Sequence, residues 1–267
     1  MMAILNVTPD SFAQRGPLDP AAAVDVALRM EAAGADVIDV GGESTRPGAE
    51  PVAAEVELAR VLPVLRALQG RLRIPISIDT YKASVAGPAL DAGAVMVNDV
   101  SGLQYDPPLV EVAAARRVAL ILMHTRGRPQ TMAAEAVYND VTAEVVAELR
   151  TSIAAACAAG VAIERIIADP GIGFAKRPSH SYGVLARLPE LAAALDRPVL
   201  AGVSRKSFLR EAAGGRPASE RDWPTAAAVT AAILGGAHIV RVHAVAEMLQ
   251  VVRAAEEIRG AGLRAGR

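Results

Sequence analysis

Short apolar segments recur along the chain, and a loop and then a stretch with helical spacing follow most of them. Their short lengths and their Val and Ile content are typical of buried parallel strands. They span residues 3–6, 37–40, 76–79, 95–99, 119–124, 165–169, 199–202 and 239–243. Between them, residues 20–35 and 53–69 carry apolar positions at the spacing of amphipathic helices.

A glycine stands just before four of these segments, in the sequences GADV, GAVM, GVAI and GAHI. Glycine at this point is typical of a helix that has just ended. Eight strands that alternate with helices predict an α/β fold, a single (β/α)8 TIM barrel over residues 1–267, with its active site at the carboxyl ends of the strands. The alternative is a doubly wound open sheet, which would not need eight evenly spread units.

The composition indicates which residues form the core and which classes of binding partner are not expected. Hydrophobic residues make up 52% of the chain but aromatic residues only 3%, so the core should consist of Ala, Val, Ile and Leu. A net charge of −1 gives no electrostatic footprint for nucleic acid or an anionic membrane. The longest uncharged run, 223–240, contains Pro and Gly-Gly and favours a helix, a turn and a strand over a membrane span.

The number of cysteines and the first residues of the sequence indicate in which cellular compartment the protein is expected. A single cysteine, Cys157, excludes an internal disulfide framework, and we expect it to be a small buried apolar residue. The first residues show no pattern of a secretory signal peptide. We therefore expect a cytoplasmic protein.

Polar residues lie at or just beyond the ends of the predicted strands. Because these ends meet on one rim of a barrel, we expect the side chains to converge there. Asp79 ends an apolar strand, where burial of an unpaired charge would be costly. This acid should therefore either cap a helix or face a cation. The set is Asn6, Asp39, Asp79, Asn98, Asp99, His124, Asp169, Ser204, Arg205, Lys206, Arg241 and His243.

Two segments predict an anion site. SRKSF (204–208) joins cations with hydroxyls, and RVH (241–243) adds positive charge on the next strand. Barrels of this type commonly bind phosphate beside the loops after strands seven and eight, so a pyrophosphate would suit this place.

Three acceptor groups, Asp79, Asn98 and Asp169, should face these cations. Such a set suits a heterocycle with several N–H donors, because one carboxylate can accept a ring N–H and an amine together. The chain lacks the spacings of a transition-metal site. A Mg²⁺ ion held mainly by pyrophosphate, with one protein oxygen such as that of Asn6, is compatible with the sequence.

Seven motifs in order carry a family resemblance. Together they resemble the dihydropteroate synthases from about residue 3 to residue 258. The motifs are ILNVTPDSF, GADVIDVGGESTRPGA, SIDTYKASVA, NDVSG, DPGIGF, SRKSF and IVRVH. The resemblance implies a transferase of folate biosynthesis, in which 4-aminobenzoate displaces pyrophosphate from 6-hydroxymethyl-7,8-dihydropterin pyrophosphate. It also implies a cytoplasmic homodimer, inhibited by sulfonamides, that binds small molecules rather than nucleic acid or membranes.

The resemblance also implies roles for individual residues. Asp79, Lys206 and Arg241 would be catalytic, and Asn6 would help to hold Mg²⁺. The pterin pyrophosphate would be bound by Thr45, Asp79, Asn98, Asp169, Lys206, Arg241 and His243. The 4-aminobenzoate would be bound by Thr45, Arg46, Pro47, Phe174 and Ser207.

The sequence departs from the family pattern at three internal positions. Gln14 stands where the family has an acid in its first loop, Ala244 where Asp is usual, and Pro224 where Gly is usual. These departures keep two alternatives open: a non-catalytic pterin-binding paralogue with a regulatory or scaffolding role, and a methyltransferase that uses methyltetrahydrofolate on a similar barrel.

Overall fold

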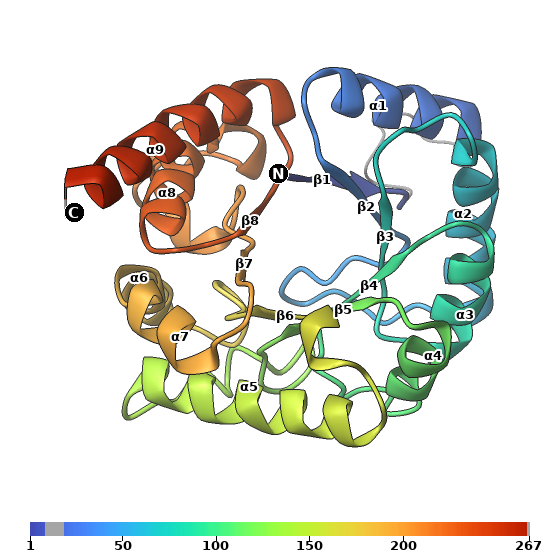
Figure 1. The fold of residues 1–267 in the computed structure, drawn as a ribbon, viewed down its shortest axis with the longest axis horizontal. Helices are drawn as coiled ribbons and strands as arrows, with labels where there is room; N and C mark the ends of the chain where they lie inside the picture. Colours follow the sequence, from blue (N-terminus) through green and yellow to red (C-terminus); the bar gives the residue numbers. More distant parts are fainter. Residues whose placement is uncertain (9–18, 266–267) are drawn as a thin grey trace.

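The computed structural model describes residues 1–8 and 19–265, and it forms a barrel of parallel strands surrounded by helices (Figure 1). The sheet order is β6-β5-β4-β3-β2-β1-β8-β7, and a parallel bridge between Ala168 and Val199 joins β6 to β7 and closes the circle. The strands are β1 (Met2–Asn6), β2 (Val37–Gly41), β3 (Ile76–Asp79), β4 (Met96–Asp99), β5 (Ala119–Met123), β6 (Ile166–Asp169), β7 (Leu200–Ala201) and β8 (Ile239–Val242).

Helices cover the outside of the barrel, as the ring of ribbons in Figure 1 shows. The α-helices are α1 (Pro20–Ala32), α2 (Ala54–Leu68), α3 (Ala83–Asp91), α4 (Leu109–Arg116), α5 (Val141–Ala158), α6 (Pro178–Ala186), α7 (Leu188–Leu195), α8 (Asp222–Leu234) and α9 (Val245–Ala265). Three short 3₁₀ helices are η1 (Ile163–Arg165), η2 (Ser207–Leu209) and η3 (Ala218–Glu220). No helix in the described ranges is both long and apolar enough to cross a membrane.

Local sequence explains where several helices begin and end. The Asp19 and Asp140 side chains accept hydrogen bonds from the first turns of α1 and α5. Gly34, Gly93, Gly160 and Gly236 follow helix ends with φ between 95° and 103°, a region that favours glycine. The predicted role of these glycines is therefore confirmed. Pro224 lies in the first turn of α8, where a missing N–H is tolerated.

Two apolar layers hold the barrel together. Outward-facing strand residues pack with the helices into one large cluster, and a smaller cluster fills the amino-terminal end of the barrel interior. The interior cluster consists of Met2, Val37, Met96, Ile121, Ile167, Leu200 and Ile239. Because side chains alternate along a strand, the inward positions two residues further on include Asp39, Asn98, Asp169 and Arg241. The barrel thus has an apolar base below a polar layer.

The strand register brings polar residues of neighbouring strands to one level. Asn6 pairs with Gly41, Gly41 with Asp79, and Asp79 with Asn98. A Cβ added to Gly41 would lie 3.4 Å from the Asp79 Oδ2 atom and 3.6 Å from the Asn6 Oδ1 atom. Gly41 therefore leaves room for both side chains to approach the same space.

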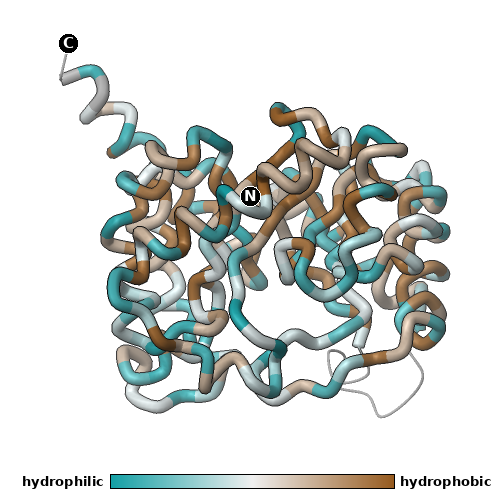
Figure 2. The backbone as a smooth tube through the Cα atoms, turned by 90° about the horizontal axis from the view of Figure 1, so that it is seen from below, coloured by the Kyte–Doolittle hydropathy of each residue, from teal (hydrophilic) through white to brown (hydrophobic). Residues whose placement is uncertain are grey.

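The predicted fold class and all eight strands are confirmed, with ends that shift by no more than one residue. The hydropathy trace of Figure 2 shows brown and teal segments alternating along the outer helices, and the end of α9 projects from the barrel. One expectation was wrong: Cys157 is exposed. In α5 the neighbouring Ala156 faces the core together with Ile153 and Leu149. The next residue is turned by about 100° and leaves that face.

Candidate active site

A pocket of about 380 Å³ opens at the carboxyl ends of the strands. All residues with an implied role line it except Asn98 and Asp169, which lie buried next to it. The residues with an implied role in its lining are Asn6, Thr45, Arg46, Pro47, Asp79, Phe174, Lys206, Ser207, Arg241 and His243. Of the other polar residues expected on this rim, Ser204 and Arg205 line the pocket, and Asp39, Asp99 and His124 do not. Gln14 lies outside the described residues.

Arg241 organises the acids at the floor of this pocket. Its Nη2 atom donates to Asp79 Oδ2 over 2.6 Å, and its Nε atom donates to Asp39 Oδ2 over 2.6 Å. Asn98 Nδ2 also donates to Asp39 Oδ2, over 2.9 Å. Asp79 therefore faces a cation and is not the N-cap of α3, because that helix begins after Lys82. Arg241 keeps further N–H groups on Nη1 and Nη2 for an anion.

Burial and the Arg241 cation shift the pKa of Asp79 in opposite directions. Burial raises the pKa of its carboxyl to about 7, the Arg241 cation lowers it, and the nearby Asp39 carboxylate raises it again. Asp39 Oδ1 is fully buried without a hydrogen-bond partner, which is costly unless a further donor reaches it. The floor thus offers acceptor oxygens to a ligand with N–H groups.

Lys206 and Asp169 form the second part of the floor. Burial lowers the pKa of Lys206 to about 8, and the Asp169 carboxylate opposes this change. The Lys206 ammonium donates to the carbonyl oxygen of Ile172 and lies 4.4 Å from the centre of the Phe174 ring. Asp169 Oδ1 accepts from the backbone N–H of Gly171 over 2.7 Å, which orients the carboxylate.

His243 presents a neutral donor at the side of the pocket. The Ser204 hydroxyl accepts from the backbone N–H of His243 over 3.2 Å and lies 2.9 Å from its Nδ1 atom. Donation of the hydroxyl proton to Nδ1 would place the ring proton on Nε2. Burial and the cation of Arg241 lower the pKa of His243 to about 3. Arg205, in contrast, is held by two 2.7 Å bonds to Asp222, so one of the two cations in SRKSF is already paired.

A buried ion cluster supports the loop after β2, which carries Thr45, Arg46 and Pro47. The Lys82 ammonium contacts the carboxylates of Glu43 and Glu57, the latter at 2.5 Å. Glu43 also accepts from the Tyr81 hydroxyl over 3.0 Å and from the backbone N–H of Val52 over 3.2 Å. Arg46 and Pro47 above this base are exposed.

Sequence reasoning gave no role to Asp39, Glu43 or Lys82. Asp39 stands inside an apolar strand, a position that signals a functional or paired acid, but its partner Arg241 is 202 residues away. Glu43 and Lys82 lie within two of the motifs, yet sequence alone does not show that they meet. Within the described residues, no three His, Cys, Asp or Glu side chains cluster as metal ligands.

Comparisons with known proteins identify the family of the chain. A family model described as pterin binding enzyme matches residues 2–243, so the chain belongs to the pterin-binding enzyme family. The chain is 46% identical to dihydropteroate synthase of Synechocystis over 97% of its own length and 89% of the relative.

Solved structures of one group within this family are similar to the chain over nearly its whole length. Dihydropteroate synthase of Xanthomonas albilineans with 4-aminobenzoic acid is 40% identical, with a TM-score of 0.90 over 97% of this chain and 92% of that one. The same enzyme in complex with 7,8-dihydropteroate gives a TM-score of 0.87 at 38% identity over the same shares. The resemblance to the dihydropteroate synthases is therefore confirmed, and neither alternative is favoured.

Proposed function

We propose that the chain condenses 6-hydroxymethyl-7,8-dihydropterin pyrophosphate with 4-aminobenzoate to 7,8-dihydropteroate and pyrophosphate. The observation that carries the proposal is one pocket lined by Asp79, Arg241 and Lys206, with the carboxylates of Asp39 and Asp169 buried beside these two cations. A pterin needs acceptors for its N–H groups, and its pyrophosphate needs cations. Relatives that share most of this chain bear the name dihydropteroate synthase.

Asp79, Asn98 and Asp169 supply the pterin end of the proposed site. A carboxylate can accept the ring N–H and the exocyclic amine of the pterin together. When the bond between the methylene carbon and pyrophosphate breaks, positive charge spreads into the pterin ring. The preorganised Asp79 carboxylate, held by Arg241, stabilises that charge without having to reorient.

Lys206, Arg241 and His243 supply the anion end. As the C–O bond breaks, its electron pair leaves with pyrophosphate. The N–H groups of these residues donate hydrogen bonds to the pyrophosphate oxygens and stabilise the negative charge. Asn6 lines the pocket with a carbonyl oxygen beside Asp79, and a hard oxygen donor suits Mg²⁺ when phosphate oxygens complete its ligands. When bound, Mg²⁺ would neutralise charge on the pyrophosphate.

The 4-aminobenzoate would enter from the open side, between the loops after β2 and β6. We propose Thr45, Arg46, Pro47, Phe174 and Ser207 as its surroundings, since they line the mouth of the pocket. The aniline nitrogen attacks the methylene carbon and afterwards loses a proton to solvent. An aniline amine is neutral near pH 7, so the attack needs no strong base in the protein.

The test is pyrophosphate release by the purified protein with the pterin pyrophosphate and Mg²⁺, with and without 4-aminobenzoate. We expect release to depend on aminobenzoate and 7,8-dihydropteroate to appear in equal amount. Saturable pterin binding without product would contradict the proposal and favour a non-catalytic pterin-binding protein, and Gln14→Asp would then be the variant to assay. A homodimer and a cytoplasmic location are proposed on the family resemblance alone.

A further inference from the structure

Lysine is rare in this chain, and its positions are informative. Of 28 basic residues only Lys82, Lys176 and Lys206 are lysines, and the others are arginines. None of the three is exposed. Lys82 and Lys206 belong to the networks described above. Lys176 has no role in the proposed chemistry, although an ammonium in this position is costly to bury.

The Lys176 ammonium has one acceptor for each of its three N–H bonds. It lies 2.8 Å from His124 Nδ1 and 3.2 Å from each of the carbonyl oxygens of Gly171 and Phe174. Burial lowers the pKa of Lys176 to about 7; the carboxylates of Asp169 and Glu148 oppose this change, while Lys206 and Arg126 add to it. Three acceptors in a compact arrangement fit an ammonium and not a planar guanidinium.

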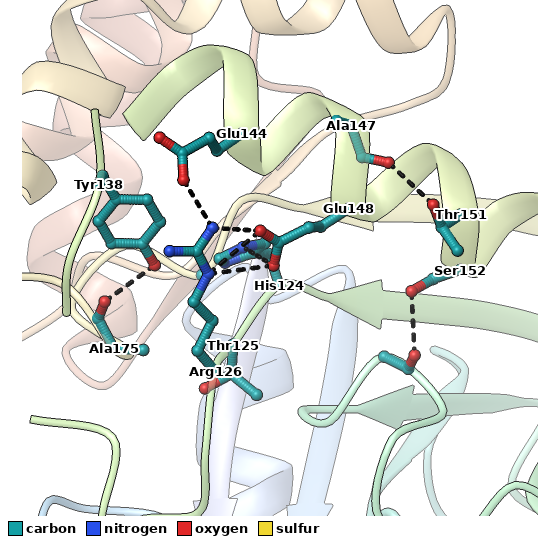
Figure 3. Close-up of polar contacts among 12 residues, drawn as sticks. His124, Thr125, Arg126, Tyr138, Glu144, Ala147, Glu148, Thr151, Ser152 and Ala175 are labelled. Atoms are coloured by element: carbon teal, nitrogen blue, oxygen red, sulfur yellow. Dashed lines mark hydrogen bonds and ion pairs between the residues drawn. The ribbon is translucent and has the colours of Figure 1, made fainter. Parts of the chain in front are cut away.

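A second layer fixes the histidine. His124 follows β5, is almost fully buried, and its Nε2 atom lies 3.0 Å from Glu148 Oε2 on α5. Figure 3 shows the Glu148 carboxylate between His124 and the Arg126 guanidinium, which also bonds to Glu144. Burial lowers the pKa of His124 to about 4, so the ring is neutral, donates from Nε2 to Glu148 and accepts at Nδ1 from Lys176.

The loop that Lys176 binds has an unusual backbone. Gly171, Gly173 and Ala175 have φ angles of 64°, 84° and 45°, and Ala175 is not a glycine. Phe174 N–H donates back to the Gly171 carbonyl over 2.9 Å. A Cβ added to Gly171 would lie 1.8 Å from the His124 carbonyl oxygen, so the loop presses directly against the end of β5. Such a backbone persists only where its surroundings hold it.

The other face of this loop forms a wall of the proposed active site. Lys206 donates to the Ile172 carbonyl and stacks on Phe174. A Cβ added to Gly173 would lie 2.9 Å from Lys206 Cδ. The loop 171–175 therefore stands between two lysines, with Lys176 behind it and Lys206 in the pocket.

We propose that Lys176 is a positioning residue that folds the loop 171–175 around its ammonium and thereby sets Phe174 in place for the aromatic amine substrate. This rests on the proposed synthase function for the identity of that substrate. Among the residues proposed for the pterin pyrophosphate, Asp79, Asn98 and Arg241 lie on β3, β4 and β8, while Asp169 and Lys206 contact this loop. Loss of Lys176 should therefore affect the two substrates unequally.

The experiment compares Lys176→Met and Lys176→Arg with Arg177→Met, which removes an exposed cation at the next position. Hydrogen exchange is followed in the peptide 170–177, together with the KM for 4-aminobenzoate and the Kd for the pterin pyrophosphate. We expect both Lys176 variants to exchange faster in this peptide and to raise the KM for 4-aminobenzoate by at least ~10-fold, because small displacements near the reacting atoms are costly. The pterin Kd should rise by a smaller factor than this KM, because only part of the pterin site contacts the loop, and Arg177→Met should match the wild type.

Each result has one meaning. Unchanged exchange and KM in the Lys176 variants, or equal weakening of both substrates, would overturn the inference, since a merely structural role weakens both. Wild-type exchange and KM in Lys176→Arg would show that a guanidinium can replace the ammonium, which contradicts the proposed fit. If Lys176→Met does not fold, Lys176→Arg carries the same readouts. A wild type that makes no dihydropteroate would refute the proposed function, and the exchange data would still decide whether Lys176 holds the loop.

Discussion

Arg241 on β8 donates to Asp79 on β3 over 2.6 Å, although the two residues are 162 positions apart. The same guanidinium bonds to Asp39, so two buried acids share one cation. Removal of one partner from such a group is costly, because the remaining charges stay buried. This arrangement explains why an apolar strand ends on an acid.

Asp79 should be essential for turnover and much less so for folding. Replacement by Asn removes the charge and keeps the shape, so we expect Asp79→Asn to lower kcat by at least ~100-fold, the usual cost of removing a main electrostatic group. Asp91→Asn, at an exposed acid on α3, is the matched control. Steady-state assays measure kcat of both variants, and near-normal turnover of Asp79→Asn would refute the electrostatic role of Asp79.

The pair Lys82 and Glu57 should show strong coupling in unfolding experiments. Lys82→Met leaves Glu43 and Glu57 buried without their cation, and we expect the free energy of unfolding to fall by about 3 kcal/mol. Adding Glu57→Leu should restore part of the loss, because the uncompensated acid is then gone. Urea unfolding of the four proteins in this cycle measures the coupling, and simple additivity would contradict it.

Stability should depend on the ionisation of His124. Its pKa in the folded protein, about 4, is below the usual 6.5, so the unfolded chain binds a proton more readily. The stability that a neutral His124 provides is thus complete above pH 6.5 and lost as pH falls towards 4. The largest contribution is about 3 kcal/mol. Unfolding between pH 7 and 4 should show a smaller loss for His124→Gln, and equal slopes would speak against the prediction.

Binding of the pterin pyrophosphate should weaken as pH rises. Burial places the pKa of Lys206 at about 8, so its positive charge is lost between pH 7 and 9 and its attraction for the anion disappears. Calorimetric titrations over this range should show the affinity fall in the wild type and a flatter profile in Lys206→Arg, whose guanidinium stays charged. An identical pH profile in both proteins would exclude Lys206 as the titrating group.

The barrel and the polar rim could be predicted because both follow from local patterns. Strand segments, the glycines after helices and the convergence of strand ends need only periodicity and a known fold type. The segment between β7 and α8 was less accessible, because it contains two 3₁₀ helices, η2 and η3. Such helices lack the length that makes a periodic pattern visible.

Long-range pairing was the part that sequence could not supply. Asp39 and Arg241, Lys82 and Glu57, and His124 and Lys176 are separated in the chain and meet only when its strands and helices pack together. Cys157 failed for a different reason: only small residues follow Ile153 in α5, so the sequence does not show whether Ala156 or Cys157 continues the buried face.

The scarcity of lysine gives this protein a built-in set of chemical probes. Its three side-chain amines occupy three separate polar networks at the mouth of the barrel, under the loop after β2, behind the loop after β6 and in the pocket itself. Reductive methylation with isotope-labelled formaldehyde would therefore mark each network with its own NMR signal. Because a buried amine reacts only when its surroundings open, the order of labelling, corrected for amine basicity, would rank these networks by how often each one opens.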